Sequence, residues 1–138
     1  MEEFVPSDEQ LRSLLASWRT VAVVGLSPNA ARPSHGVARY LQAHGYRIIP
    51  VRPAVAEVLG ERAWSSLEEI PEPVDVVDVF RNPAQALPVA EAAVRIGARA
   101  LWLQEGVVNE AAARWAADHG LTVVMDRCML KEHQRLLG

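Results

Sequence analysis

Two kinds of hydrophobic pattern alternate along the chain. Short, mostly continuous apolar runs predict strands buried on both faces, and they fall at residues 20–24, 46–51, 74–80, 99–104 and 121–125. Between the runs, apolar residues recur at three- and four-residue spacing, which predicts amphipathic helices at residues 8–18, 33–44, 84–96, 109–119 and 126–137. A sixth strand, at an edge, is predicted around residues 62–64, and a single helical turn around residues 66–69. The pattern is therefore strand–helix alternation from end to end.

Polar residues and glycines at the segment ends support these boundaries. Ser7 and Gln10 have the spacing of a capping box, and Asn109 is placed to cap the fourth long helix. Gly45 and Gly97 follow helical segments as stop signals. Asp126 is expected to cap the last helix.

The alternation predicts an α/β fold, namely a Rossmann-like doubly wound parallel sheet with helices on both faces. With six strands numbered along the chain, the expected order is 3-2-1-4-5-6. We expect residues 1–138 to form a single domain, in which the helix of residues 1–19 packs on the sheet.

Composition narrows the function classes. The chain has 138 residues, half of them apolar, and a formal net charge of −3 without a basic run, so a nucleic-acid surface is not expected. Acidic residues stand where a signal peptide would be basic, and no apolar run approaches the roughly 18 residues of a membrane span. We expect a cytoplasmic protein without a membrane segment. The single cysteine allows neither an internal disulfide nor a structural zinc site.

The loops after four strands are predicted to open at one edge of the sheet, where ligands of such folds bind. Backbone N–H groups and the next helix N-terminus would meet a phosphate beyond Gly25. Arg52 stands where NAD-binding folds usually carry an acid, which favours a phosphorylated ribose and hence NADP or coenzyme A (CoA). The alternatives are a solvated loop arginine at position 52 and, for Phe80, ordinary core in place of an adenine surface.

Five motifs in order carry a resemblance to a known family: V-x-V-V-G-x-S followed by R-P-S, Y-x-I-x-P-V-x-P, V-D-V-V-D-V-F-R, W-L-Q-E-G-V and D-R-C-M-x-x-E-H. The chain resembles the stand-alone CoA-binding domain family, which is similar to the N-terminal CoA-binding domain of the succinyl-CoA synthetase α subunit. The family often has asparagine where this chain has Arg52.

The resemblance implies that CoA is held by residues from four loops. Gly25, Ser27, Arg32 and Ser34 would hold the pyrophosphate region, Val51-Arg52-Pro53 the phosphorylated ribose, Phe80 and Arg81 the adenine side, and Gln104 and Gly106 the pantetheine end. The implied function is binding of CoA or a short acyl-CoA, as a non-catalytic protein or as a module for a partner. The alternative is an NADP-dependent oxidoreductase that uses the same crevice.

Catalysis is not favoured by the remaining polar residues. The synthetase relays a phosphoryl group through a histidine in a second domain, which this chain does not include. Cys128, Glu132 and His133 could form a nucleophilic site, but the helical rotation turns His133 away from the thiol. A thiol at position 128 could form a mixed disulfide with CoA, although burial is the favoured fate of a lone cysteine. Asp75 and Asp78 point to opposite faces of their strand and are not a paired-carboxylate site.

Contacts with other proteins are left open by the sequence. A protein partner or a homodimer is possible, with Trp64, Leu101 and Trp102 as candidate surface residues. Burial in the core is the favoured alternative for these side chains, because each lies in or beside a predicted strand.

Overall fold

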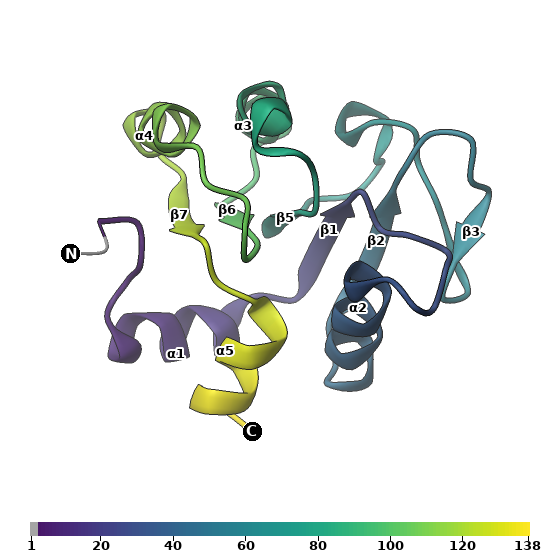
Figure 1. Cartoon of the computed structure of the whole chain (residues 1–138), viewed down its shortest axis with the longest axis horizontal. Coiled ribbons are helices and arrows are strands. Elements are labelled where there is room, and N and C mark those ends of the chain that lie inside the picture. The colour runs from purple at the N-terminus through teal and green to yellow at the C-terminus, as the bar shows by residue number, and fades with distance from the viewer. Residues whose placement is uncertain (1–2) are drawn as a thin grey trace.

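A parallel sheet of five strands forms the centre of the computed structural model, which describes residues 3–138 (Figure 1). The strands are β1 (Thr20–Val24), β2 (Arg47–Val51), β5 (Val76–Val79), β6 (Ala100–Leu103) and β7 (Thr122–Met125). They lie in the order β2-β1-β5-β6-β7, and every neighbouring pair is parallel. The predicted doubly wound α/β fold is confirmed. Residues 1 and 2 of the predicted N-terminal segment lie outside the described residues.

Two helix layers cover the sheet (Figure 1). Helices α1 (Asp8–Ser17), α2 (Pro33–Ala43) and α5 (Met129–Leu136) pack on one face, and α3 (Ala86–Arg95) and α4 (Glu110–Asp118) on the other. Two 3-10 turns, at Leu67–Glu69 and Pro83–Gln85, precede β5 and α3. The turn predicted at residues 66–69 is thus present, and the first turn of the predicted helix 84–96 is a separate 3-10 turn.

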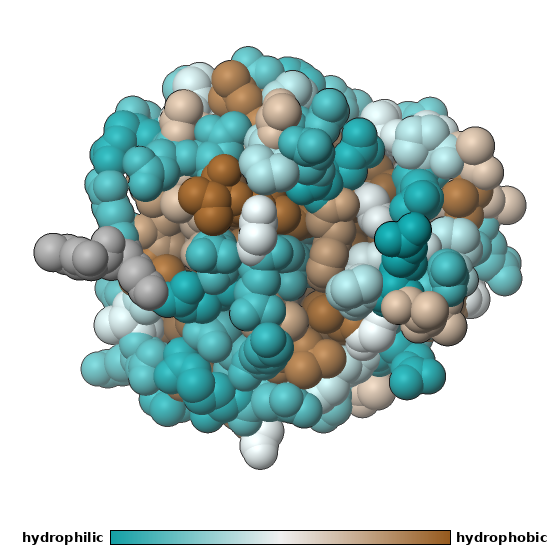
Figure 2. Space-filling view, in the orientation of Figure 1, coloured by the Kyte–Doolittle hydropathy of each residue, from teal (hydrophilic) through white to brown (hydrophobic). Residues whose placement is uncertain are grey.

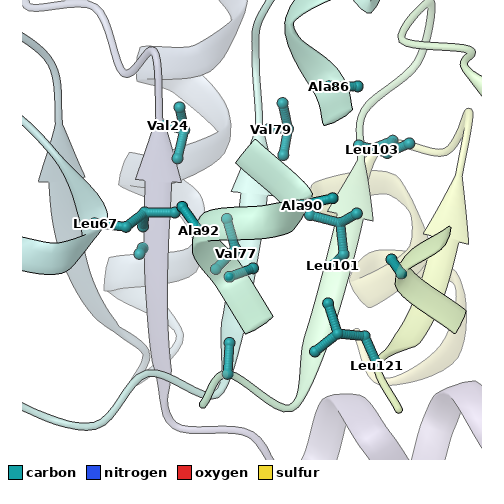
Figure 3. Packing of buried hydrophobic residues seen from close by; sticks show 14 of the residues in the cluster. Val24, Leu67, Val77, Val79, Ala86, Ala90, Ala92, Leu101, Leu103 and Leu121 are labelled. Atoms are coloured by element: carbon teal, nitrogen blue, oxygen red, sulfur yellow. The ribbon is translucent and has the colours of Figure 1, made fainter. Parts of the chain in front are cut away.

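Alternating strand residues contribute to two hydrophobic cores, one on each face of the sheet. Val21 and Val23 point towards α1, α2 and α5, whereas Ala22 and Val24 point towards α3 and α4. Figure 3 shows the second core, in which strand valines and leucines meet the alanines of α3. These small side chains let the helix lie close to the sheet, and each buried valine or leucine contributes about 1.5–3 kcal/mol relative to exposure.

The N-terminal helix is fixed by its cap and by its apolar face. The Gln10 backbone N–H donates to Ser7 Oγ at 3.2 Å, and the Ser7 backbone N–H donates to Gln10 Oε1 at 3.1 Å, which confirms the capping box. Trp18, next to the helix, meets Trp102 edge to face with 6.3 Å between ring centroids. Leu101 and Trp102 are fully buried, so the core interpretation of these two residues is confirmed.

The edge strand predicted at residues 62–64 is wrong. Instead, β3 (Glu57–Val58) and β4 (Glu61–Arg62) form a small antiparallel hairpin, turned by Leu59 and Gly60 in left-handed conformations. Trp64 makes the backbone bridge from this segment to the main sheet: its N–H donates to Pro50 O at 3.0 Å, and its carbonyl accepts from the Arg52 N–H at 2.8 Å. The backbone N–H and C=O groups that would pair a sixth strand with β2 are instead hydrogen-bonded within the hairpin.

Asp126 does not cap the last helix. It has a φ of 60°, in the left-handed region that aspartate tolerates, and its Oδ1 accepts the Gly106 N–H at 2.9 Å. Cys128 is the residue at the start of α5, and its side chain makes no capping hydrogen bond. Asp126 therefore ties the loop after β6 to the loop after β7.

Polar residues cover most of the side of the molecule in Figure 2, with smaller apolar patches among them. No helix within residues 3–138 is both long enough and apolar enough to span a bilayer. In the same part of the chain, no three His, Cys, Asp or Glu side chains are grouped to hold a metal ion.

Candidate functional site

The sheet has its topological switch point between β1 and β5. From β1 the chain moves outward to β2 and then returns to β5 on the other side of β1, so the connections diverge at the carboxyl ends of these two strands. Open α/β sheets bind ligands at such a point. A crevice of about 840 Å³ lies there, lined by Gly25, Ser27, Pro28, Asn29, Arg32, Pro33, Ser34, Val37, Arg52, Phe80, Arg81, Asn82, Gln104, Glu105, Val107 and Cys128.

Most of the predicted site residues meet in this crevice: Gly25, Ser27, Arg32, Ser34, Arg52, Phe80, Arg81 and Gln104. Val51 and Pro53 line a smaller hollow of about 190 Å³, which shares Arg81 with the crevice. Gly106 lines neither hollow, and its N–H donates to Asp126 Oδ1 at 2.9 Å. The predicted set therefore divides into two hollows, and Gly106 lies outside both.

Gly25 sets the close approach of the two central strand ends. Its N–H donates to Val51 O, and the Phe80 N–H donates to Val24 O, each at 2.9 Å. With a φ of 88°, Gly25 adopts a conformation that other residues rarely take, and an added Cβ would overlap the Phe80 carbonyl oxygen. Only glycine fits at this point of the crevice.

The loop after β1 is folded against the first turn of α2. Ser34 Oγ accepts the Ser27 N–H at 3.0 Å, and Ser27 Oγ accepts the Asn29 N–H at 3.0 Å. Pro33 occupies the first helical turn, where its missing N–H costs nothing. The positive dipole end of α2 therefore lies at the crevice, where an anion is stabilised.

Positive side chains dominate the crevice walls. Arg32 and Arg81 are exposed, and Arg52 is half-buried with its Nη1 donating to Gly25 O at 3.2 Å. The acidic residue of the lining, Glu105, forms an ion pair with Lys131, with 2.9 Å between Glu105 Oε1 and Lys131 Nζ. Three guanidinium groups and a helix N-terminus at one crevice suit a ligand with several phosphates.

Phe80 contributes to both the core and the crevice. Its ring is half-buried and packs against the core on the α1, α2 and α5 side, while the residue also lines the crevice. The two interpretations of Phe80 from the sequence are thus compatible, since a partly exposed ring still offers a flat apolar surface.

At the inner end of the crevice, a buried amide rests on a buried carboxyl group. Gln104 is 3% exposed, and its Nε2 donates to Asp78 Oδ1 at 2.8 Å. Asp78 is fully buried, Oδ2 has no hydrogen-bond partner, and burial raises the pKa of this carboxyl group to about 7. Sequence reasoning had excluded Asp78 only as half of a carboxylate pair. A lone acid within a valine-rich strand was the available signal.

Asp75 has a separate, structural role at the other end of β5. Its Oδ2 accepts the backbone N–H groups of Arg19 and Thr20 at 2.8 and 3.0 Å. The prediction that Asp75 and Asp78 do not form a pair is consistent with these different partners.

The polar residues of the last helix do not form a catalytic set. Cys128 lines the crevice, and burial raises the pKa of its thiol. Glu132 pairs with Arg135 at 2.8 Å, and His133 Nδ1 lies 2.8 Å from the Tyr40 hydroxyl. The Glu132 carboxylate and the His133 imidazole are thus bound to Arg135 and Tyr40 rather than to the Cys128 thiol.

The comparisons with known proteins show the family. The model of a family described as CoA binding domain matches residues 19–134, and the chain belongs to that family. The resemblance stated from the five motifs is therefore confirmed, and the chain is a CoA-binding domain with a Rossmann-like fold.

Relatives cover the chain almost completely. The uncharacterized protein YneT of Bacillus subtilis (strain 168) is 43% identical over 128 residues, which are 93% of this chain and 95% of YneT. A hypothetical protein from Pyrococcus horikoshii OT3 has 38% identity and a TM-score of 0.96, covering 100% of this chain and 97% of its own.

A distant structure shares the fold. Acetyl-coenzyme A synthetase 1 of Ca. Korarchaeum cryptofilum superposes with a TM-score of 0.72 at 20% identity, covering 83% of this chain and 28% of the synthetase.

Proposed function

We propose that the protein binds coenzyme A or a short acyl-CoA in the crevice at the carboxyl edge of the sheet. The observation that carries the proposal is the convergence of three arginines and the α2 N-terminus at the switch point of a CoA-binding domain. CoA carries a pyrophosphate and a 3′-phosphate, so it offers the anions that this charge needs. The crevice, at about 840 Å³, lies within the 300–1,000 Å³ that is usual for cofactor sites.

Each part of CoA has complementary residues in or beside the crevice. The pyrophosphate suits the loop of residues 25–34, with Arg32 above it and the α2 N-terminus beside it. The 3′-phosphate suits Arg52, and the adenine suits Phe80, Arg81 and the smaller hollow that contains Val51 and Pro53. The pantetheine arm then runs towards Gln104, with Gly106 on the loop beyond.

The role that we propose is binding, alone or as a module for a partner protein. Bound CoA would supply a thiol or a thioester to the crevice. The residues of this chain hold and orient the ligand, while Glu132 and His133 are engaged elsewhere and leave Cys128 without a general base.

One observation also favours the alternative of an NADP-dependent oxidoreductase. Arg52, at the end of β2, would meet the 2′-phosphate of NADP as well as the 3′-phosphate of CoA. The two ligands differ in the second half of the molecule, so direct binding measurements separate them.

Calorimetric titration with CoA, acetyl-CoA, dephospho-CoA and NADPH tests the proposal. We expect saturable binding of CoA and acetyl-CoA, weaker binding of dephospho-CoA, and no comparable response to NADPH. Tight NADPH binding together with no response to CoA would overturn the proposal in favour of the oxidoreductase.

A further inference from the structure

Asp78 lies beneath the inner end of the crevice, in the middle of the sheet. In the strand register it stands between Val23 of β1 and Trp102 of β6. Its side chain is on the same strand face as Val76 and Phe80, and it is fully buried. A carboxyl group in such a place needs partners, because removing its charge from water is costly.

The partner that Asp78 has is a neutral amide. Oδ1 accepts from Gln104 Nε2 at 2.8 Å, and the buried Oδ2 has no hydrogen-bond partner. One of the two carboxyl oxygens is therefore left without a partner.

The protonation state of Asp78 controls whether the Gln104 amide can turn, because only the protonated form can donate to Gln104 Oε1. An ionised carboxylate only accepts hydrogen bonds, so it holds the NH₂ group of Gln104 and leaves Oε1 available at the crevice. A protonated carboxyl group carries an O–H that can donate to Oε1. The amide would then be turned, and its NH₂ group would face the crevice.

We propose that Asp78 is a positioning residue, which sets through Gln104 whether the inner end of the crevice presents a hydrogen-bond acceptor or a donor to the ligand. The inference rests on the proposed CoA function, because the pantetheine arm carries amide N–H groups that an acceptor can hold. CoA then binds best to the form with ionised Asp78.

Both the ionised and the protonated form of Asp78 are accessible near neutral pH. Burial is the main cause that raises the pKa of Asp78, to about 7, and the Gln104 hydrogen bond opposes it. Apart from the arginines, the titratable groups of the crevice lining are the Cys128 thiol and the Glu105 carboxylate, which is ion-paired with Lys131. The guanidinium groups of the crevice are those of Arg32, Arg52 and Arg81.

The first test is the pH dependence of dephospho-CoA binding, since this ligand lacks the 3′-phosphate that itself titrates near neutral pH. For the wild type we expect affinity to rise roughly two- to tenfold from pH 5.5 to 8.5, the range that one uncharged hydrogen bond gives. Asp78→Asn cannot titrate and should lose this rise. Asp75→Asn, directly before β5 and at the opposite end of this strand from the crevice, should keep it.

Two results of this titration would overturn the inference. One is an identical pH profile for the wild type and Asp78→Asn. The other is an affinity that falls as pH rises in the wild type alone, because the ligand would then prefer the protonated form.

The second test needs no folded variant at position 78. In the wild type without ligand, the ¹⁵N resonance of the Gln104 side-chain amide should shift with pH, with a midpoint near the Asp78 pKa of about 7. A resonance that does not move between pH 5.5 and 8.5 would overturn the inference. If CoA fails to bind at any pH, the proposed function is wrong, and this titration decides the Asp78–Gln104 switch separately.

Discussion

Arg52 is the residue through which the crevice would recognise the phosphorylated ribose. Its Nη1 is held by Gly25 O, which keeps the guanidinium at the crevice wall. We predict that Arg52→Ala weakens CoA binding by about 1.5–3 kcal/mol, the value of a hydrogen bond to a charged group. Calorimetry should show no such loss for dephospho-CoA, which lacks the 3′-phosphate.

Arg62 provides the control for this measurement. It lies over the Trp64 ring on the hairpin, 3.9 Å from the ring centroid, and does not line the crevice. Arg62→Ala should leave the affinity for both ligands unchanged. An equal loss for CoA and dephospho-CoA in Arg52→Ala would show that Arg52 acts elsewhere on the ligand.

Asp78 also affects stability. Its pKa rises from 3.8 to about 7 on folding, so the folded state binds the proton more tightly and the stability contributed by this group is lost as pH rises from about 4 to 7. Asp78→Asn removes this dependence. From pH 5 to pH 8 its unfolding free energy should gain about 2–3 kcal/mol relative to the wild type, measured by urea denaturation. Parallel pH profiles would contradict this account.

Single residues of the crevice could be predicted where each directly follows a parallel strand. Gly25, Arg52, Phe80 and Gln104 meet because the register aligns the ends of β1, β2, β5 and β6. The hydrogen bond between Asp78 and Gln104 joins side chains 26 positions apart, and no local pattern predicts it. Its energetic effect comes from tertiary burial.

Gly25 is the junction of β1, β2 and β5, and a side chain there should disturb all three strands. Gly25→Ala combines a φ of 88° with an overlap on the Phe80 carbonyl, so we expect a loss of unfolding free energy of at least about 2 kcal/mol. Gly120→Ala is the matched control, because Gly120 has a φ of 93° with open space around it and should lose only about 1 kcal/mol. Equal losses of unfolding free energy for the two variants in urea denaturation would contradict the close approach of the Phe80 carbonyl to Gly25.

Helix α5 is held to α2 through a neutral histidine. His133 contacts the Tyr40 hydroxyl, and burial first and His44 second lower the pKa of His133 below 6.5. The neutral ring therefore contributes stability that is present above pH 6.5 and lost as pH falls through the lowered pKa. The protection factors of the α5 amides in hydrogen exchange, corrected for the intrinsic exchange rate at each pH, should therefore be lower at pH 5.0 than at pH 7.5.

His133→Gln tests the cause of this change, because glutamine does not titrate. In this variant the difference between the two pH values should shrink. His119→Gln, which alters an exposed imidazole bound to the Trp115 carbonyl on α4, should retain the wild-type difference. A difference that persists in His133→Gln would place the titrating group elsewhere.

The long periodic elements could be predicted, whereas two short features could not. The five main strands and five helices follow from their apolar spacing, and the cap at Ser7 from its box. The edge strand expected at residues 62–64 and the helix cap expected at Asp126 are absent, because the polar groups concerned form other hydrogen bonds in the folded chain. Leu59 and Gly60 turn the chain into a hairpin, and Gly106 binds the carboxylate that would have capped α5.

In the molecule as a whole, the fold converts a net negative chain into one with a locally positive crevice. The net charge is −3, yet Arg32, Arg52 and Arg81 gather where four strand ends meet, and Lys131 neutralises Glu105. Charge distribution, which follows from topology, therefore predicts an anionic ligand that net charge alone would not.

The position of CoA on the protein is the central claim, and an NMR titration of the ¹⁵N-labelled chain with CoA tests it directly. The account predicts that the largest amide shifts fall in the loops after β1, β2, β5 and β6, among residues 25–34, 52–53, 80–82 and 104–107. Shifts centred instead on the hollow between the N-terminal segment and β7, lined by Ser7, Leu14 and Val123, would contradict it.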